Sequence, residues 1–103
     1  MIKVEVCKEK DLYKKVSIIG HAMYADYGKD IVCSAVSSIV TTTINGCIAL
    51  DKDSLSYEVN EEGVYISNIV GDNTNTLIDN MVSLLKELEE KYKFITIYPV
   101  NYS

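Results

Sequence analysis

The spacing of apolar residues changes along this chain from a period of two residues to a period near 3.6 and back, twice over. Ile2, Val4 and Val6 alternate with polar neighbours, which is the pattern of a strand with one buried face. The run Leu12–Ile19 is rich in apolar and β-branched residues and stops at Gly20, which predicts a second strand. The chain is therefore expected to begin as a β-hairpin.

Two longer stretches have helical periodicity. Over Ile31–Leu50 the apolar residues recur as neighbouring pairs four positions apart, and this spacing outweighs the low helix propensity of the many Val, Ile and Thr residues. Over Leu77–Tyr92 a leucine-rich stripe lies opposite charged residues, which predicts a second helix. Between these helices, Leu55–Val59 and Val64–Ile69 flank a turn that contains Gly63, the pattern of a second hairpin.

The last element is predicted to be a strand over Phe94–Val100, where Pro99 suits an edge position because proline lacks a backbone N–H. The expected order is therefore ββαββαβ. A chain of 103 residues is long enough for one hydrophobic core. We predict an α+β fold that forms a single domain over residues 1–103, with a mainly antiparallel sheet and two helices packed on it.

Charge and cysteine content exclude several classes of function. With 15 acidic and 10 basic residues the net charge is -5, which disfavours direct nucleic-acid binding and suits a basic partner. Three cysteines without a CxxC pair and a single histidine predict neither a disulfide framework nor a metal site. No cofactor is expected.

The chain is also expected to stay off the membrane. Ile31–Leu50 has no charged residue, but Ser, Thr and Asn interrupt it throughout, which argues against a bilayer-spanning segment. The N-terminal residues alternate in polarity and have no apolar block, so they do not form a secretory signal. These features predict a cytoplasmic protein.

One cysteine and the single histidine form the candidate catalytic pair. If Asp30 is the N-cap of the first helix, Cys33 is its third residue, where unpaired amides and the helix dipole favour a thiolate. His21, in a loop between Gly20 and Asp30, could serve as the general base. The same amides could stabilise the oxyanion formed when the thiolate attacks a carbonyl.

Each candidate also has an ordinary structural interpretation. Most cysteines in proteins are packing residues, and we keep that interpretation for Cys7 and Cys47. Spacing alone leaves the pairing of His21 with Cys33 an even choice between a catalytic pair and unrelated residues. Asp30 is an N-cap first and an acid that orients the histidine second, and Ser37, one turn after Cys33, could simply pack. The loop aromatic residues could bind substrate or cover the core: Tyr24 and Tyr27.

The run from Gly20 to Ser37 resembles the signature of the bacterial ribosomal-processing cysteine proteases of the Prp family. It contains His21 and Cys33 at the family spacing and both loop glycines, Gly20 and Gly28. Ser34 departs from the alanine common in that family, but it remains small. The resemblance implies that Cys33 and His21 are catalytic and that Gly20, Asp30 and Ser37 support them. The loop would then bind substrate through these residues: Tyr24, Tyr27 and Gly28.

By this resemblance the chain is expected to be a homodimeric cysteine endopeptidase. Its substrate would be a ribosomal protein precursor of the large subunit, whose N-terminal extension is removed after a hydrophobic sequence that ends in aromatic residues. The reaction would proceed by thiolate attack and a thioester acyl-enzyme. Two alternatives remain at this point: a non-enzymatic ribosome-assembly or regulatory binding module, and a small-molecule or redox-sensing domain with a reactive Cys33.

Overall fold

The computed structural model describes the backbone of residues 1–20 and 29–101, and these residues form five strands and two helices in the predicted order. The strands are β1 (Ile2–Glu9), β2 (Leu12–Ile19), β3 (Ser56–Asn60), β4 (Gly63–Ser67) and β5 (Ile95–Asn101). The helices are α1 (Lys29–Leu50) and α2 (Asp72–Lys91). The element order ββαββαβ is thus confirmed.

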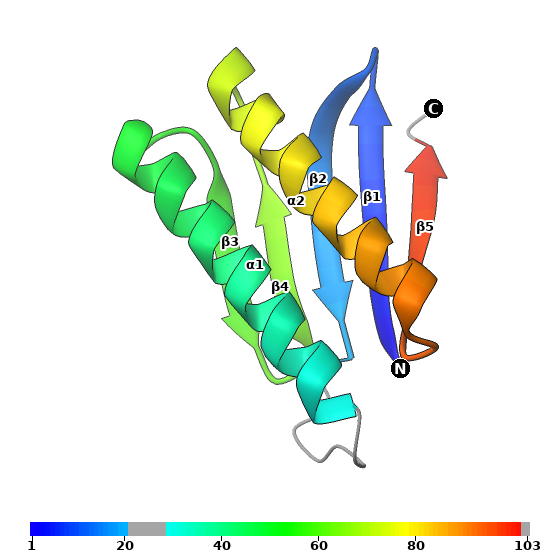
Figure 1. Cartoon of the computed structure of the whole chain (residues 1–103). Helices are drawn as coiled ribbons and strands as arrows, with labels where there is room; N and C mark the ends of the chain where they lie inside the picture. The colour runs from blue at the N-terminus through cyan, green and yellow to red at the C-terminus, as the bar shows by residue number, and fades with distance from the viewer. Residues whose placement is uncertain (21–28, 102–103) are drawn as a thin grey trace.

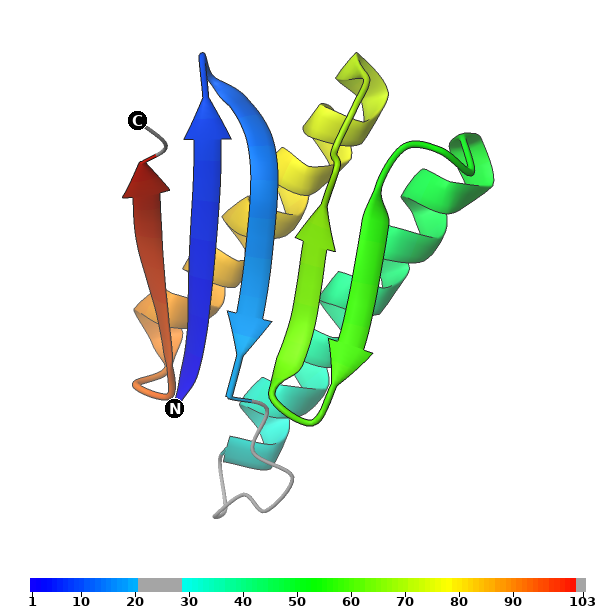
Figure 2. The same cartoon turned by 180° about the vertical axis from the view of Figure 1, so that it is seen from behind.

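The strands form one mixed sheet in the order β3-β4-β2-β1-β5. The pairs β1–β2, β2–β4 and β3–β4 are antiparallel, and β5 joins β1 in parallel. Both helices lie on the same face of the sheet (Figure 1), and the view from behind shows that the described elements leave the other face uncovered (Figure 2). The predicted α+β fold with a mainly antiparallel sheet is confirmed.

The core lies between the helices and the covered face of the sheet. Alternate residues of β1 point into it, as their spacing predicts, while Val32, Val36 and Val40 of α1 are almost completely buried. A valine loses at most about 0.7 kcal/mol of helix propensity relative to alanine. Burial of its side chain contributes about 1.5–3 kcal/mol. Tertiary packing therefore explains why a segment so rich in β-branched residues is a helix.

Helix α1 is long and apolar enough over Ile31–Leu50 to cross a membrane, by length and composition alone. The Ser, Thr and Asn residues of the segment, from which we predicted that it does not span a bilayer, do not lower its hydropathy enough to fail this test. Five of the 20 residues in this segment are buried. The core helix of a globular domain meets the same criterion, and α1 packs one side against the sheet and α2. We therefore interpret it as the core helix of this fold.

The start of α1 differs from the prediction. The helix begins at Lys29, so Asp30 is its second residue and the predicted N-cap role of Asp30 is wrong. Lysine is a good helix former, so nothing in its propensity prevents the helix from starting there. Cys33 is consequently the fifth residue of the helix and not the third.

A buried tyrosine ties the N-terminal hairpin to α2. The Tyr13 hydroxyl donates a hydrogen bond of 2.5 Å to Asp79 Oδ1, and its backbone N–H donates one of 2.8 Å to Asn75 Oδ1. Burial, and then the hydrogen bond and the charge of Asp79, raise the pKa of the Tyr13 hydroxyl well above its usual range. The folded protein therefore holds this proton more tightly than the unfolded chain does.

Replacing Tyr13 with phenylalanine should lower the free energy of unfolding at neutral pH by about 1.5 kcal/mol, because a hydrogen bond to a carboxylate is lost. In the wild type, stability should also fall as the pH rises above about 10, where an unfolded tyrosine releases its proton and the folded one retains it. Urea denaturation between pH 7 and 11 measures both effects. A Tyr13→Phe variant with unchanged stability and an unchanged alkaline slope would contradict this account.

Candidate active site

Cys33 lies near the N-terminal end of α1, at the end of the sheet where β2 stops and the β3–β4 turn lies (Figures 1 and 2). Its side chain is half-buried and packs partly against the hydrophobic core. Val32 and Val36 on the neighbouring helix face are fully buried, which fixes the rotation of the helix and leaves Cys33 at the border between core and solvent. Ser37, one turn later, is exposed.

The earlier start of α1 changes the position of its unpaired amides. In a regular α-helix that begins at Lys29, the N–H of Cys33 donates to the carbonyl of Lys29. The amides without an intrahelical acceptor belong to the turn before it, at Lys29, Asp30 and Ile31. Any oxyanion held by this helix end would therefore contact that first turn and not the amide of Cys33 itself.

The three cysteines of the chain all lie in the described residues, and each is a thiol. Cys7 on β1 and Cys47 on α1 are buried, with 7% and 1% of their surface exposed. Burial raises the pKa of the Cys47 thiol, which favours its unreactive protonated form. Cys33 is the most exposed of the three, so it is the cysteine best placed to meet a substrate.

Gly20 anchors the chain immediately before His21. It has a positive φ of 88°, and a Cβ at this position would lie 2.5 Å from the carbonyl oxygen of Met1. Its N–H donates a hydrogen bond of 2.8 Å to the carbonyl of Glu62 in the β3–β4 turn. Glycine is required here by both the backbone angle and the close approach. Gly20, the residue directly before His21, is therefore held in place against Met1 and the β3–β4 turn.

The remaining predicted site residues are only partly covered by the structure. His21, Tyr24, Tyr27 and Gly28 lie outside the described residues. Asp30 is described as part of the backbone of α1. The contact between His21 and Cys33 therefore stays a prediction, which rests on the positions of Gly20 and of the start of α1 at the same end of the sheet (Figure 1).

Gly63 helps to position Gly20 near the candidate site. From the sequence it was identified only as a turn residue. It is buried where β4 meets β2, and a Cβ there would lie 2.0 Å from the carbonyl oxygen of Ile18. This close approach brings the preceding residue, Glu62, within hydrogen-bonding distance of Gly20. The sequence offers no signal for it, because the pairing of β2 with β4 joins segments far apart in the chain.

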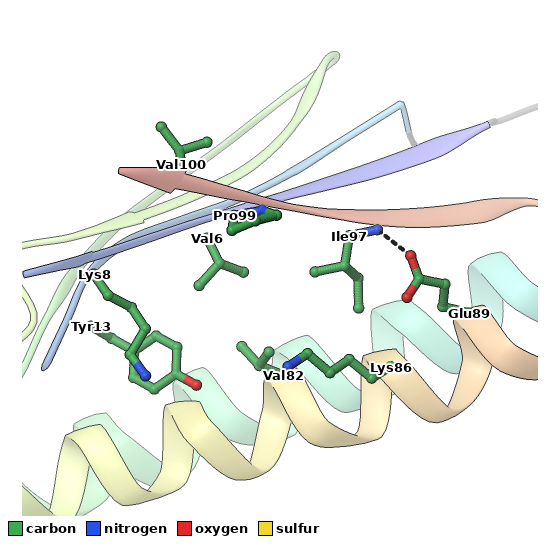
Figure 3. Close-up of a pocket in the computed structure, with 9 residues that line it drawn as sticks. All are labelled: Val6, Lys8, Tyr13, Val82, Lys86, Glu89, Ile97, Pro99 and Val100. Atoms are coloured by element: carbon green, nitrogen blue, oxygen red, sulfur yellow. Dashed lines mark hydrogen bonds between the residues drawn. The ribbon is translucent and has the colours of Figure 1, made fainter. Parts of the chain in front are cut away.

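A hollow of about 240 Å³ lies between α2 and the strands β1 and β5, toward the β5 edge of the sheet (Figure 3). Apolar side chains form its floor, and Lys8 and Lys86 reach into it (Figure 3). Its lining residues come from β1, β2, α2 and β5. Because α1 contributes none of these residues, the hollow is separate from the Cys33 site.

Comparison with known proteins assigns this chain to a family. The family model described as cysteine protease Prp matches residues 1–96. The ribosomal processing cysteine protease Prp of Staphylococcus aureus strain Mu50 is 27% identical over 97 residues, which cover 89% of this chain and 92% of that protein. The Prp of Bacillus subtilis strain 168 is 28% identical over 82 residues, or 72% of this chain and 73% of that protein.

Solved structures agree with the fold. The crystal structure of the S. aureus processing protease Prp in complex with a substrate peptide has a TM-score of 0.86 at 24% identity, and covers 97% of this chain and 100% of that one. The structure of SMU.848 from Streptococcus mutans has a TM-score of 0.86 at 26% identity, with coverage of 99% and 96%. Given the family match over nearly all of its length, the chain belongs to the Prp family of cysteine proteases.

Proposed function

We propose that this chain is a cysteine endopeptidase that removes the N-terminal extension of a bacterial large-subunit ribosomal protein. The observation that carries the proposal is the position of Cys33, a half-buried thiol near the start of α1, at the same end of the sheet as Gly20, the residue before His21 in the sequence. The names of the relatives, ribosomal processing proteases, support the substrate class. Ribosomes are assembled in the bacterial cytoplasm, so the enzyme acts there.

In the proposed mechanism His21 takes the proton from Cys33 Sγ, and the thiolate attacks the carbonyl carbon of the scissile bond. The C–N bond breaks, the new amine takes the proton from His21, and the N-terminal fragment stays on sulfur as a thioester. Water, activated by the same imidazole, then hydrolyses the thioester and restores the thiol. No cofactor takes part.

The supporting roles follow the resemblance of the motif. Gly20 fixes the backbone before His21, Asp30 orients the imidazole, and the Ser37 hydroxyl lies one helical turn from the sulfur. Tyr24, Tyr27 and Gly28 contact the hydrophobic and aromatic residues of the cleavage sequence. The net charge of -5 attracts a precursor that is basic overall.

A peptide that spans the processing site of a large-subunit ribosomal protein precursor tests the proposal. Under reducing conditions the wild-type chain should cut it once, directly after the hydrophobic sequence, and mass spectrometry identifies both fragments. A peptide that is bound but stays intact would favour a non-enzymatic binding module instead. A peptide that is neither bound nor cut would contradict the proposed substrate.

We also propose that the enzyme is a homodimer that pairs through the outer face of α1. Copies with a net charge of -5 repel each other, and Ile31–Leu50 offers a long surface without a charged side chain. Ile31 and Leu50 are 55% and 66% exposed at its two ends. The residues between them on this outer face are small and exposed, which allows close helix packing: Ser34, Ser37, Ser38, Thr41, Thr42 and Asn45.

A Thr41→Glu variant should be a monomer, because each copy would bring a buried, unpaired carboxylate to the interface. Light scattering after size-exclusion chromatography should give the mass of a dimer for the wild type and of a monomer for this variant. Ser83→Glu on the exposed side of α2 is the matched control and should remain a dimer. A monomeric wild type, or a dimeric Thr41→Glu variant, would contradict the proposed interface.

A further inference from the structure

The two edge strands of the sheet differ, and the edge at β5 is protected against the addition of another strand. On the outer side of β5, Glu89 Oε2 of α2 accepts a hydrogen bond of 2.7 Å from the backbone N–H of Ile97 (Figure 3). Two residues later on the same side, Pro99 has no N–H to offer. A strand that approached this edge would find one donor occupied and the next one missing, so β5 resists strand addition.

Within the part of the chain that the structure describes, the opposite edge has neither of these protections. Among the described strands, β3 pairs with β4 alone, and all five of its residues are exposed. Tyr57 and Val59 are paired in register with the buried Ile66 and Val64, so they point to the helix side of the sheet. Even there they remain 50% and 64% exposed. The strand therefore offers both open backbone groups and uncovered apolar side chains.

From this asymmetry we propose that the outer edge of β3 binds a basic, extended segment of the protein substrate as an added strand. This inference rests on the proposed function, because it assigns a docking site to the precursor that Cys33 cleaves. Backbone hydrogen bonds along the edge supply affinity, and side chains at alternate positions supply specificity.

The charge of the second hairpin selects a basic segment. Glu58, Glu61 and Glu62 are all exposed, and the sequence has no basic residue between Lys52 and Lys86. In an antiparallel pair of two β3 strands centred on Glu58, the Glu58 carboxylates of the two copies would lie directly opposite each other, which disfavours a second copy as the occupant. A peptide that alternates apolar and basic residues would cover Tyr57 and Val59 on one face and meet Glu58 on the other.

The direction of β3 connects this edge to the catalytic cysteine. The strand runs toward the β3–β4 turn, which lies at the same end of the sheet as the start of α1 (Figure 2). Glu62 in that turn accepts the hydrogen bond from Gly20, next to the segment that contains His21. A chain that follows the edge of β3 therefore arrives at the end of the molecule where cleavage is proposed.

Hydrogen exchange tests the docking site directly. The probe is the precursor peptide described above, extended on both sides of the scissile bond by basic residues and added in excess to a Cys33→Ala variant. Exchange of alternate β3 amides should slow several-fold or more in the complex, while the amides of β5 should exchange as in the free protein. Peptide binding without added protection in β3 would overturn the inference and leave the proposed function standing.

Matched charge reversals test the role of Glu58. Glu58→Lys should raise KM for the peptide about fivefold with little change in kcat, because an attraction at the docking strand becomes a repulsion. Glu90→Lys changes the net charge equally, on the exposed side of α2, and should leave KM within about twofold. Equal effects of the two substitutions would overturn the inference. A peptide that the wild type never cleaves would count against the proposed function instead.

Discussion

A Cys33→Ala variant is expected to cleave the precursor peptide at least about 10³-fold more slowly than the wild type, because the reaction loses its nucleophile. The fold should survive, since the side chain is only half-buried and alanine is a good helix former. Initial rates of peptide cleavage, measured beside circular dichroism spectra, check both statements.

The other cysteines provide the control for this prediction. Cys7→Ala removes a buried thiol from β1 and should leave kcat within a few-fold of the wild type, provided that the variant is folded at the assay temperature. If Cys33→Ala cleaves the peptide at the wild-type rate, Cys33 is not the nucleophile. Loss of activity in Cys7→Ala but not in Cys33→Ala would instead identify Cys7 on β1 as the nucleophile.

The largest effect on stability is expected for Gly63→Ala. The new Cβ would lie 2.0 Å from the carbonyl oxygen of Ile18, and φ at this position is +155°. Relief of this clash requires β4 to move away from β2, with loss of backbone hydrogen bonds, so the free energy of unfolding should fall by roughly 3 kcal/mol. This is a large part of the total of about 5–15 kcal/mol that stabilises a typical domain. Thermal and urea denaturation measure the change.

Gly46→Ala is the matched substitution with the opposite expected sign. Gly46 lies inside α1, and a Cβ there would meet no described atom within 4 Å beyond its chain neighbours and the nearby backbone of its own helix. Alanine should therefore stabilise the protein by about 0.5–1 kcal/mol, through its higher helix propensity. A Gly63→Ala variant as stable as Gly46→Ala would show that the β2–β4 contact does not constrain the fold.

Local patterns in the sequence predicted most elements because burial of one face produces a periodic pattern; β3, whose five residues are all exposed, is the exception. The second strand was predicted with its observed bounds, since its apolar run ends at Gly20, where the backbone adopts a positive φ. The start of α1 was misplaced by two positions, because Asp30 has cap chemistry but lies within the helix. Capping propensity is a preference of about 1 kcal/mol, which tertiary contacts readily override.

No local pattern in the sequence predicted which strands pair with each other. The parallel pairing of β5 with β1, and the contact of Gly63 with Ile18, join residues far apart in the sequence. For the candidate site, the sequence correctly placed Cys33 in the first turns of a helix and Gly20 at the end of a strand. That the two lie at the same end of the sheet follows from strand order, which the sequence did not predict. The pairing of His21 with Cys33 stays a prediction.

The central claim is that the Cys33 sulfur carries the N-terminal fragment during cleavage. An acid quench of wild-type enzyme mixed with excess precursor peptide, followed by intact-mass spectrometry and peptide mapping, tests it most directly. We expect an added mass equal to the N-terminal fragment minus water, located on Cys33 and removable by hydroxylamine. Efficient peptide cleavage with no adduct on Cys33, together with full activity of Cys33→Ala, would contradict the account.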